Sequence, residues 1–307
     1  MTIHPVAILA SGAPLAIHLH EIRGHRPGPL VGISAGVHGD ELNGPEIVYR
    51  FLSGLDPAAL SGTLRVVPVA NPLAYAAVSR FTPVDGMNLN RVIPGATDGT
   101  LTERLAAVLA SRLLDGLDVY VDVHSGGAFP TVDYAYILNA EALSRASGFG
   151  VLYRPSAGLA GTSYEGTTSS YTQSRGTASV VLEIGGGAVD QADYVDRGVR
   201  AITNILRAQG VLAGTPAPPP RQTVVRRIVI LRPAAAGLLL PETTELGRIV
   251  PMGHLLGRVV SPYTLETLEE IRSPLEAGLV ILAHLRANKV DPGDYGYMVG
   301  DMASAEA

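Results

Sequence analysis

Two short stretches of this sequence combine histidine with carboxylates at spacings that suit a metal ion. His38 and Glu41 form an H-x-x-E pattern just after an apolar run, so that an imidazole and a carboxylate can reach one cation. His124 ends a second apolar run. Two imidazoles and one carboxylate leave a fourth position on Zn²⁺ for water, so His38, Glu41 and His124 predict a catalytic zinc site. A loop histidine, a glutamate in a first helical turn and a buried structural histidine are the alternatives.

Glu183 stands in the run VVLEIGGG, which is otherwise free of charge. An unpaired buried carboxylate is costly, so we expect Glu183 to face the metal cavity. There it would take a proton from water and pass it to a leaving amine. A buried ion pair with an arginine is the alternative. Asp122 shares a strand face with His124 and is expected to orient that ligand.

A third group of polar residues flanks a loop that contains glycine and proline. Arg80 precedes this loop, and Asn90 and Arg91 follow it. Guanidinium groups in such places could hold a substrate carboxylate and a developing oxyanion. Ordinary surface arginines are the alternative.

Other catalytic chemistries have few candidates. The chain has no cysteine, which excludes thiolate nucleophiles, and its single lysine, Lys289, leaves little scope for a Schiff base. The segment Gly32-Ile-Ser-Ala-Gly36 matches the G-x-S-x-G pattern, which would make Ser34 a hydrolase nucleophile. This pattern is short and common, and His38 lies only four residues further on.

The elements around these residues predict an α/β fold. Apolar runs at 29–34, 64–69, 119–123, 134–138 and 179–184 predict strands, and amphipathic spacing over 41–55, 101–114 and 195–212 predicts helices. Residues 3–23 predict a hairpin. Such alternation indicates a mixed, mostly parallel sheet with its chemistry at the carboxyl ends of the strands. The metal ligands and Glu183 all fall at such ends.

The composition changes after a proline-rich linker at 214–221. We therefore expect a catalytic domain over 1–214 and a small all-β domain over 222–300, where short apolar runs alternate with glycine and proline. The net charge of −5 argues against nucleic-acid and anionic-membrane partners. No secretory signal or spanning segment is visible, which predicts a cytoplasmic protein. A homo-oligomer is left open.

Five stretches, taken in order, resemble the succinylglutamate desuccinylase/aspartoacylase family, a branch of the zinc carboxypeptidases. They are GVHGDE ending at Glu41, NPLAY at 71–75, SRFTPVDGMNLNR at 79–91, DVHSGG at 122–127 and LEIGGG at 182–187. The resemblance implies a carboxypeptidase-like three-layer domain with one Zn²⁺. It also implies that Arg80 polarises the scissile carbonyl, that Asn90 and Arg91 bind the substrate carboxylate, and that Glu183 is the general base and acid.

The resemblance further implies a deacylase that hydrolyses a small N-acyl amino acid, and the match looks closest to deacetylases of N-acetyl-diaminobutyrate. A carboxypeptidase acting on short peptides and a non-catalytic small-molecule-binding relative are the alternatives. The C-terminal part looks like a biotinyl/lipoyl-type β-sandwich without a modifiable lysine. Two positions depart from the common pattern: Asn88 stands where many members have aspartate, and Arg175 is offset from a substrate-binding arginine of aspartoacylases.

Overall fold

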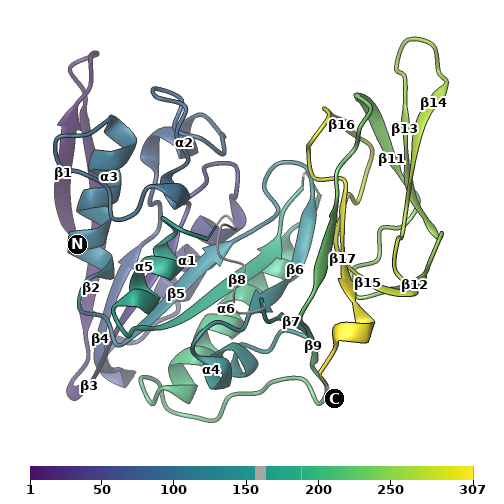
Figure 1. The fold of residues 1–307 in the computed structure, drawn as a ribbon. Helices are drawn as coiled ribbons and strands as arrows, with labels where there is room; N and C mark the ends of the chain where they lie inside the picture. The colour runs from purple at the N-terminus through teal and green to yellow at the C-terminus, as the bar shows by residue number, and fades with distance from the viewer. Residues whose placement is uncertain (156–163, 188, 307) are drawn as a thin grey trace.

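A long mixed β-sheet runs through the computed structural model, which describes residues 1–155, 164–187 and 189–306 (Figure 1). Its strand order is β1-β2-β4-β3-β5-β8-β6-β15-β17-β10, with β12 beside β15 and with β7 and β9 beyond β6. The strands up to residue 225 are β1 (Thr2–Ile8), β2 (Pro14–Arg23), β3 (Arg26–Ala35), β4 (Ser61–Val67), β5 (Val119–His124), β6 (Thr131–Tyr136), β7 (Val151–Tyr153), β8 (Ala178–Gly185) and β9 (Thr223–Val225).

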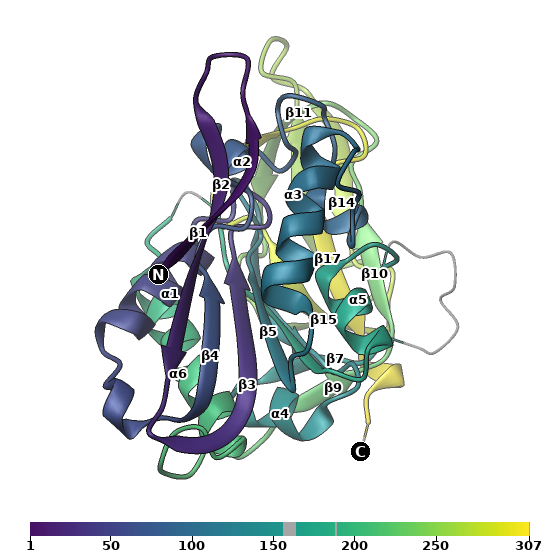
Figure 2. The same ribbon diagram turned by 90° about the vertical axis from the view of Figure 1, so that its left-hand side faces the viewer.

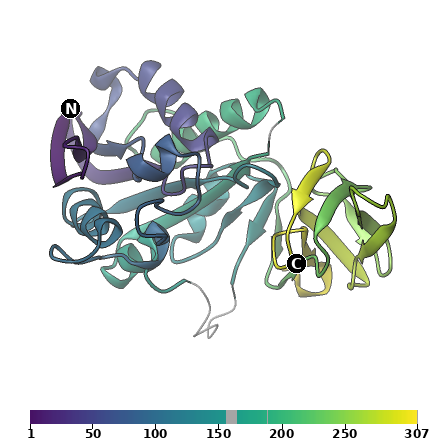
Figure 3. The same cartoon turned by 90° about the horizontal axis from the view of Figure 1, so that it is seen from above.

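Helices cover both faces of this sheet (Figure 3). They are α1 (Asn43–Ser53), α2 (Pro72–Ala76), α3 (Leu101–Leu109), α4 (Glu141–Ala146), α5 (Thr168–Ser174) and α6 (Ala192–Ala208). Shorter turns are η1 (Pro57–Ala59), η2 (Leu89–Arg91) and η4 (Met302–Ser304), and the π-helical turn η3 (Ala110–Leu114) continues α3. Within the described ranges, no helix combines the length and apolar character needed to cross a membrane.

Strand periodicity decides which side chains meet which helices. Val119, Val121 and Val123 of β5 belong to the same buried cluster as residues of α1, α4 and α6. The residues between them alternate to the opposite face, where Tyr120 packs in a second cluster with α3. Asp122 and His124 share that second face, and so does Glu183 of β8. The catalytic candidates therefore gather on one face of the sheet.

The predicted mixed sheet is confirmed, with parallel pairing concentrated at its centre. Strands β4, β3, β5 and β8 are parallel neighbours, whereas β6 runs antiparallel to β8. The predicted N-terminal hairpin is also present: β1 and β2 pair antiparallel at the outer edge of the sheet (Figure 2).

The chain beyond the proline-rich segment folds into strands that both continue the long sheet and form a second one. The second sheet has the order β14-β13-β11-β16. These later strands are β10 (Ile228–Leu231), β11 (Gly237–Pro241), β12 (Ile249–Pro251), β13 (Leu255–Val260), β14 (Thr267–Arg272), β15 (Ala277–Ala283), β16 (Asn288–Val290) and β17 (Tyr297–Asp301). Because β15 pairs with β6 and β9 pairs with β7, this part is joined to the catalytic sheet by backbone hydrogen bonds.

Candidate active site

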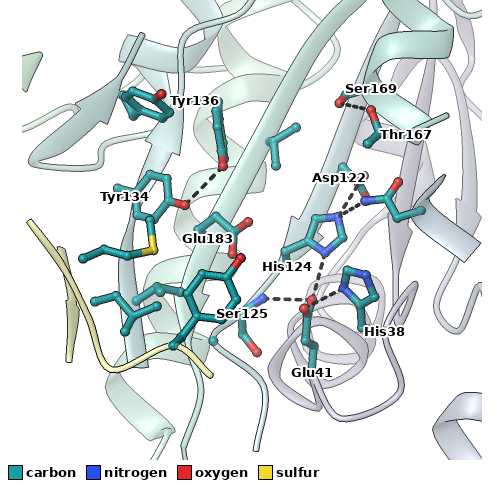
Figure 4. A pocket seen from close by; sticks show the side chains of 18 of the residues that line it. His38, Glu41, Asp122, His124, Ser125, Tyr134, Tyr136, Thr167, Ser169 and Glu183 are labelled. Atoms are coloured by element: carbon teal, nitrogen blue, oxygen red, sulfur yellow. Dashed lines mark hydrogen bonds and ion pairs between the residues drawn. The ribbon is translucent and has the colours of Figure 1, made fainter. Parts of the chain in front are cut away.

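Three buried side chains, His38, Glu41 and His124, converge at one end of the central strands (Figure 4). His38 Nδ1 lies 2.7 Å from Glu41 Oε1, and His124 Nδ1 lies 2.8 Å from Glu41 Oε2. The three ligand atoms all lie within 4.8 Å of one another. The sequence-predicted triad is thus brought together by segments that are far apart in the chain.

The outer nitrogen of each histidine faces an oxygen acceptor. His38 Nε2 lies 3.1 Å from Asn88 Oδ1, and His124 Nε2 lies 3.1 Å from Asp122 Oδ2. The carboxylate of Glu41 also only accepts, so without a metal each ring lies between two acceptor oxygens. A cation between Nδ1 and Glu41 would take the Nδ1 lone pair and leave the proton of each ring on Nε2. Two imidazole Nδ1 atoms beside one carboxylate form a ligand set that fits Zn²⁺, and the outer contacts orient the two rings.

Glu41 was expected to lie at the start of a helix, and this prediction is wrong in its boundary. Helix α1 begins at Asn43, and Glu41 lies in the preceding loop. Its carboxylate accepts a hydrogen bond from the backbone N–H of Ser125 (3.2 Å) in addition to its contacts with the two imidazoles. The helix begins later because Pro45, which lacks an N–H, suits a first helical turn.

The loop that carries His38 packs closely on α2, and this contact explains the glycine of the HGDE segment. A Cβ on Gly39 would lie 1.9 Å from the carbonyl carbon of Ala74, so no larger residue fits there. Asn71 caps α2 by accepting from Ala74 N (3.1 Å), and its Nδ2 donates to Thr82 Oγ1 (2.9 Å). The NPLAY stretch therefore connects the loop of His38 to the loop of Arg80.

Glu183 lies in register between two strands at the site. On β5 its partner is His124, and on β6 its partner is Tyr134, so the three side chains form a row on one face of the sheet (Figure 4). Loss of hydration raises the pKa of Glu183 from 4.5 to about 8, and the charge of His124 partly opposes this shift. No arginine forms an ion pair with Glu183 among the described residues, so the buried ion-pair alternative is not supported.

Arg80 and Arg91 bring positive charge to the same pocket. Arg80 Nη1 donates to Glu41 Oε1 at 3.3 Å, whereas Arg91 makes no ion pair in the described part of the chain. Burial and the nearby Arg80 both lower the pKa of Arg91, which indicates a guanidinium group that lacks a counter-ion. Asn90 is buried next to them, with Nδ2 3.4 Å from His124 Nε2.

Another part of the pocket lining is formed by uncharged residues from strands, and one loop, that are far apart in the sequence. We call this surface the uncharged wall; it consists of Tyr134, Tyr136, Ile230, Leu282, Tyr295 and Met298. Tyr134 and Tyr136 alternate on β6, and their rings lie 5.3 Å apart. We call the charged lining residues the charged half; it consists of His38, Glu41, Arg80, Arg91, Asp122, His124 and Glu183. The two groups adjoin, because Glu183 is the register partner of Tyr134 and Arg91 lies near Tyr136 and Tyr295.

Several residues near the site have roles that the sequence did not reveal. Thr168, at the start of α5, donates from its backbone N–H to Asn90 Oδ1 (2.9 Å) and from its hydroxyl to Asp122 Oδ2. Ser34 is fully buried, and its hydroxyl donates to Asp122 Oδ1 (2.8 Å). Its contacts with Asp122 and Tyr120, rather than a histidine, favour a structural role over that of a nucleophile.

Comparison with known proteins places this geometry in a family. A model of the succinylglutamate desuccinylase/aspartoacylase catalytic domain matches residues 27–209. The N-alpha-acetyl-L-2,4-diaminobutyric acid deacetylase of Halomonas elongata is 30% identical, over 76% of this chain and 70% of the relative.

Solved structures agree over nearly the whole chain. A succinylglutamate desuccinylase from Silicibacter sp. TM1040 has a TM-score of 0.82 at 26% identity, covering 96% of this chain and 91% of that one. The product-bound ectoine utilization protein EutE of Ruegeria pomeroyi has a TM-score of 0.83 at 27% identity, covering 97% and 93%. The chain belongs to the succinylglutamate desuccinylase/aspartoacylase family.

Proposed function

We propose that this protein is a zinc-dependent deacylase that hydrolyses the amide bond of a small N-acyl amino acid. The observation that carries the proposal is the convergence of His38, Glu41 and His124 beside the partly buried carboxylate of Glu183. The names of its relatives, a deacetylase of an acetylated diamino acid and a desuccinylase, support the same reaction class.

In this proposal His38, Glu41 and His124 hold the metal, and Asp122 and Asn88 orient the two imidazoles. A bound Zn²⁺ acts as a Lewis acid toward the amide carbonyl and makes water easier to deprotonate. The other steps belong to the side chains of the protein.

Glu183 accepts a proton from the attacking water as the new C–O bond forms. It then delivers that proton to the amine as the C–N bond breaks, so a carboxylate and a free amino acid leave the site. The raised pKa of Glu183 suits both roles, because a group with a pKa close to the working pH can accept and return a proton.

Arg80 lies next to the triad and stabilises the negative charge that develops on the carbonyl oxygen. Arg91 and Asn90 bind the substrate carboxylate. This assignment fits a guanidinium group that lacks a counter-ion, because a carboxylate can pair with it through two parallel hydrogen bonds.

The test is hydrolysis of a panel of N-acetyl amino acids, N-succinyl amino acids and dipeptides by the metal-replete protein. We expect turnover of at least one acyl-amino acid, loss of that turnover after chelation and recovery on adding Zn²⁺. His124→Ala should lose bound metal, measured by elemental analysis. The matched control His254→Ala should keep metal and activity, because His254 contacts Thr243 in the second sheet region and does not line the pocket.

Two results would contradict the proposal. Hydrolysis that survives chelation, with phosphonate labelling of Ser34, would establish serine chemistry instead. Bound metal without turnover of any panel member would indicate a binding protein.

A further inference from the structure

The uncharged wall indicates which kind of chemical group the substrate places next to the scissile amide, a property that the proposed catalytic residues do not determine. It begins one strand away from the base, because Tyr134 is the register partner of Glu183. It continues across the antiparallel strand β15, where Leu282 pairs with Val132 on β6. A group attached to the scissile amide at Glu183 therefore lies against this wall.

The charged side chains that line the pocket, in the part of the chain the structure describes, all lie in the charged half. Asp122 already receives hydrogen bonds from Ser34 and Thr168 and contacts His124. Arg80 and Arg91 are assigned to the carbonyl oxygen and the carboxylate of the substrate. No cation is left for an acidic side chain, and no carboxylate except the base is left for an ammonium group.

The residues outside the described part of the chain add no charged side chain that could line the pocket. Residues 156–163 contain no acidic or basic residue. A charged substrate group at the wall would thus lose its hydration without gaining an ion pair, which is costly.

The wall itself is suited to apolar and aromatic groups. Burial raises the pKa of Tyr134 and Tyr136 well above the ordinary value, so both phenols are neutral at physiological pH. The ring centroid of Tyr136 lies 5.3 Å from that of Tyr134 and 5.4 Å from that of Tyr153. Aromatic faces also attract cations, but Leu282 and Met298 share this wall, and the described lining offers no carboxylate at the wall other than the base.

We propose that the preferred substrate is an N-acyl amino acid whose group at this wall is apolar or aromatic, rather than acidic or cationic. The inference rests on the proposed function and makes it more specific. The group is either the amino-acid side chain or the acyl chain, since both flank the scissile amide.

The first experiment measures kcat/KM of the metal-replete protein with two matched series. The N-acetyl series contains leucine, phenylalanine, aspartate and 2,4-diaminobutyrate; the glycine series contains N-hexanoyl and N-succinyl derivatives. We expect the apolar or aromatic member to exceed its charged counterparts by at least about tenfold in one series, and that series identifies the group at the wall. A charged substrate that matches or exceeds the apolar one in both series overturns the inference, while its turnover preserves the proposed function.

If no compound is hydrolysed, the proposed function fails, and calorimetric binding of the same compounds decides the inference. Tighter binding of the apolar members supports it. Equal or tighter binding of the charged members, or no binding of any, overturns it.

A pair of variants tests the wall directly. Ile230→Arg places a cation on the wall at a residue that is 43% exposed and so tolerates a larger side chain. It should shift the preference from N-acetyl-leucine toward N-acetyl-aspartate, or from N-hexanoyl- toward N-succinyl-glycine, by at least about tenfold. Ile249→Arg makes the same change on β12, away from the pocket, and should leave the preference unchanged. An unchanged preference in Ile230→Arg, with thermal unfolding like that of the wild type, overturns the inference.

Discussion

The charged half and the uncharged wall line the same pocket but are built differently. In the charged half, polar side chains are held by specific partners, such as Asn88 on His38 and Asp122 on His124. These residues come from the ends of parallel strands and from the loops after them. The wall comes from β6 and from strands and a loop beyond residue 225, and its side chains meet mainly through packing.

This difference suggests a division of labour. Fixed hydrogen bonds hold a reactive geometry to within small tolerances, as bond making requires. Packing against apolar side chains selects a substrate by size and polarity and adjusts more readily to substitution. Changes in the charged half should therefore alter the rate for every substrate, and changes in the wall should alter the order of preference.

The largest effect should follow from Glu183→Gln, which removes the proton acceptor but keeps the shape of the side chain. We expect kcat to fall by about 10²–10⁴-fold with metal content unchanged. If the two regions are independent, the ratio of kcat/KM between any two substrates stays constant. Near-full activity would exclude Glu183 as the base, and an altered ratio would show that Glu183 also selects the substrate.

The dependence of kcat/KM on pH should show the titration of Glu183 in the unmodified protein. A raised pKa keeps Glu183 protonated to higher pH, so kcat/KM should decline as the pH falls through the pKa, by about tenfold per pH unit below it. Burial, partly opposed by the charge of His124, raises the pKa of Glu183 from 4.5 to about 8, and a bound cation would lower the pKa within that interval. Metal content must be constant across the range. Constant kcat/KM throughout this interval would contradict the role of Glu183.

Arg91→Ala tests how far the charged half recognises substrate as well as reacting with it. A charge-assisted pair is worth about 1.5–3 kcal/mol, so we expect a loss of about 10–100-fold in kcat/KM for substrates with a free carboxylate. The matched substrates are the corresponding amides, which should lose much less. An equal loss on acids and amides would assign Arg91 to a structural role.

Asn88→Ala tests whether the outer partner of His38 matters for metal binding. Loss of such a partner commonly weakens metal affinity by about 10–100-fold, which a competition titration with a chromophoric chelator measures. Asn88 Oδ1 also accepts from Asn90 N at 2.9 Å, so the alanine variant also loosens the loop. Asn88→Asp keeps both acceptor contacts and should restore or exceed the affinity of the wild type. If both variants bind metal like the wild type, Asn88 does not support His38.

The sequence was sufficient to predict the triad because each ligand follows a recognisable strand, and parallel strands bring their carboxyl ends together. The same reasoning led us to expect Glu183 beside this triad, where it is the register partner of His124; its role as the base remains a prediction. The contacts of Asn88 and Thr168 could not be predicted, because they depend on how a loop and a short helix pack against the strands. Because Asn88 departs from the family pattern, the sequence indicated that this position was unusual. It did not indicate that Asn88 contacts His38.

The uncharged wall was missed for a different reason. Tyr134 and Tyr136 show the alternation of a strand, but alternation does not tell which face is the pocket. Ile230, Leu282 and Met298 lie in a part of the chain predicted to be a separate small domain. The pairing of β15 with β6 and of β9 with β7 brings these residues to the site, and pairing between distant strands leaves little trace in a single sequence.

The smallest effect should come from Arg175→Ala, at the position where the family resemblance suggested a substrate-binding arginine. Its side chain is 51% exposed, with Nε 3.4 Å from Asp115 Oδ1 and the guanidinium group over the ring of Tyr171. It is not among the residues that line the pocket. Because the side chain is exposed and lies outside the pocket, kcat/KM should stay within about twofold of the wild type for acidic and apolar substrates alike. The exposed ion pair contributes at most about 1 kcal/mol to stability, so the variant should also fold normally. A loss confined to acidic substrates would mean that Arg175 reaches the pocket during turnover. The charged half would then have to include Arg175 as a further cation.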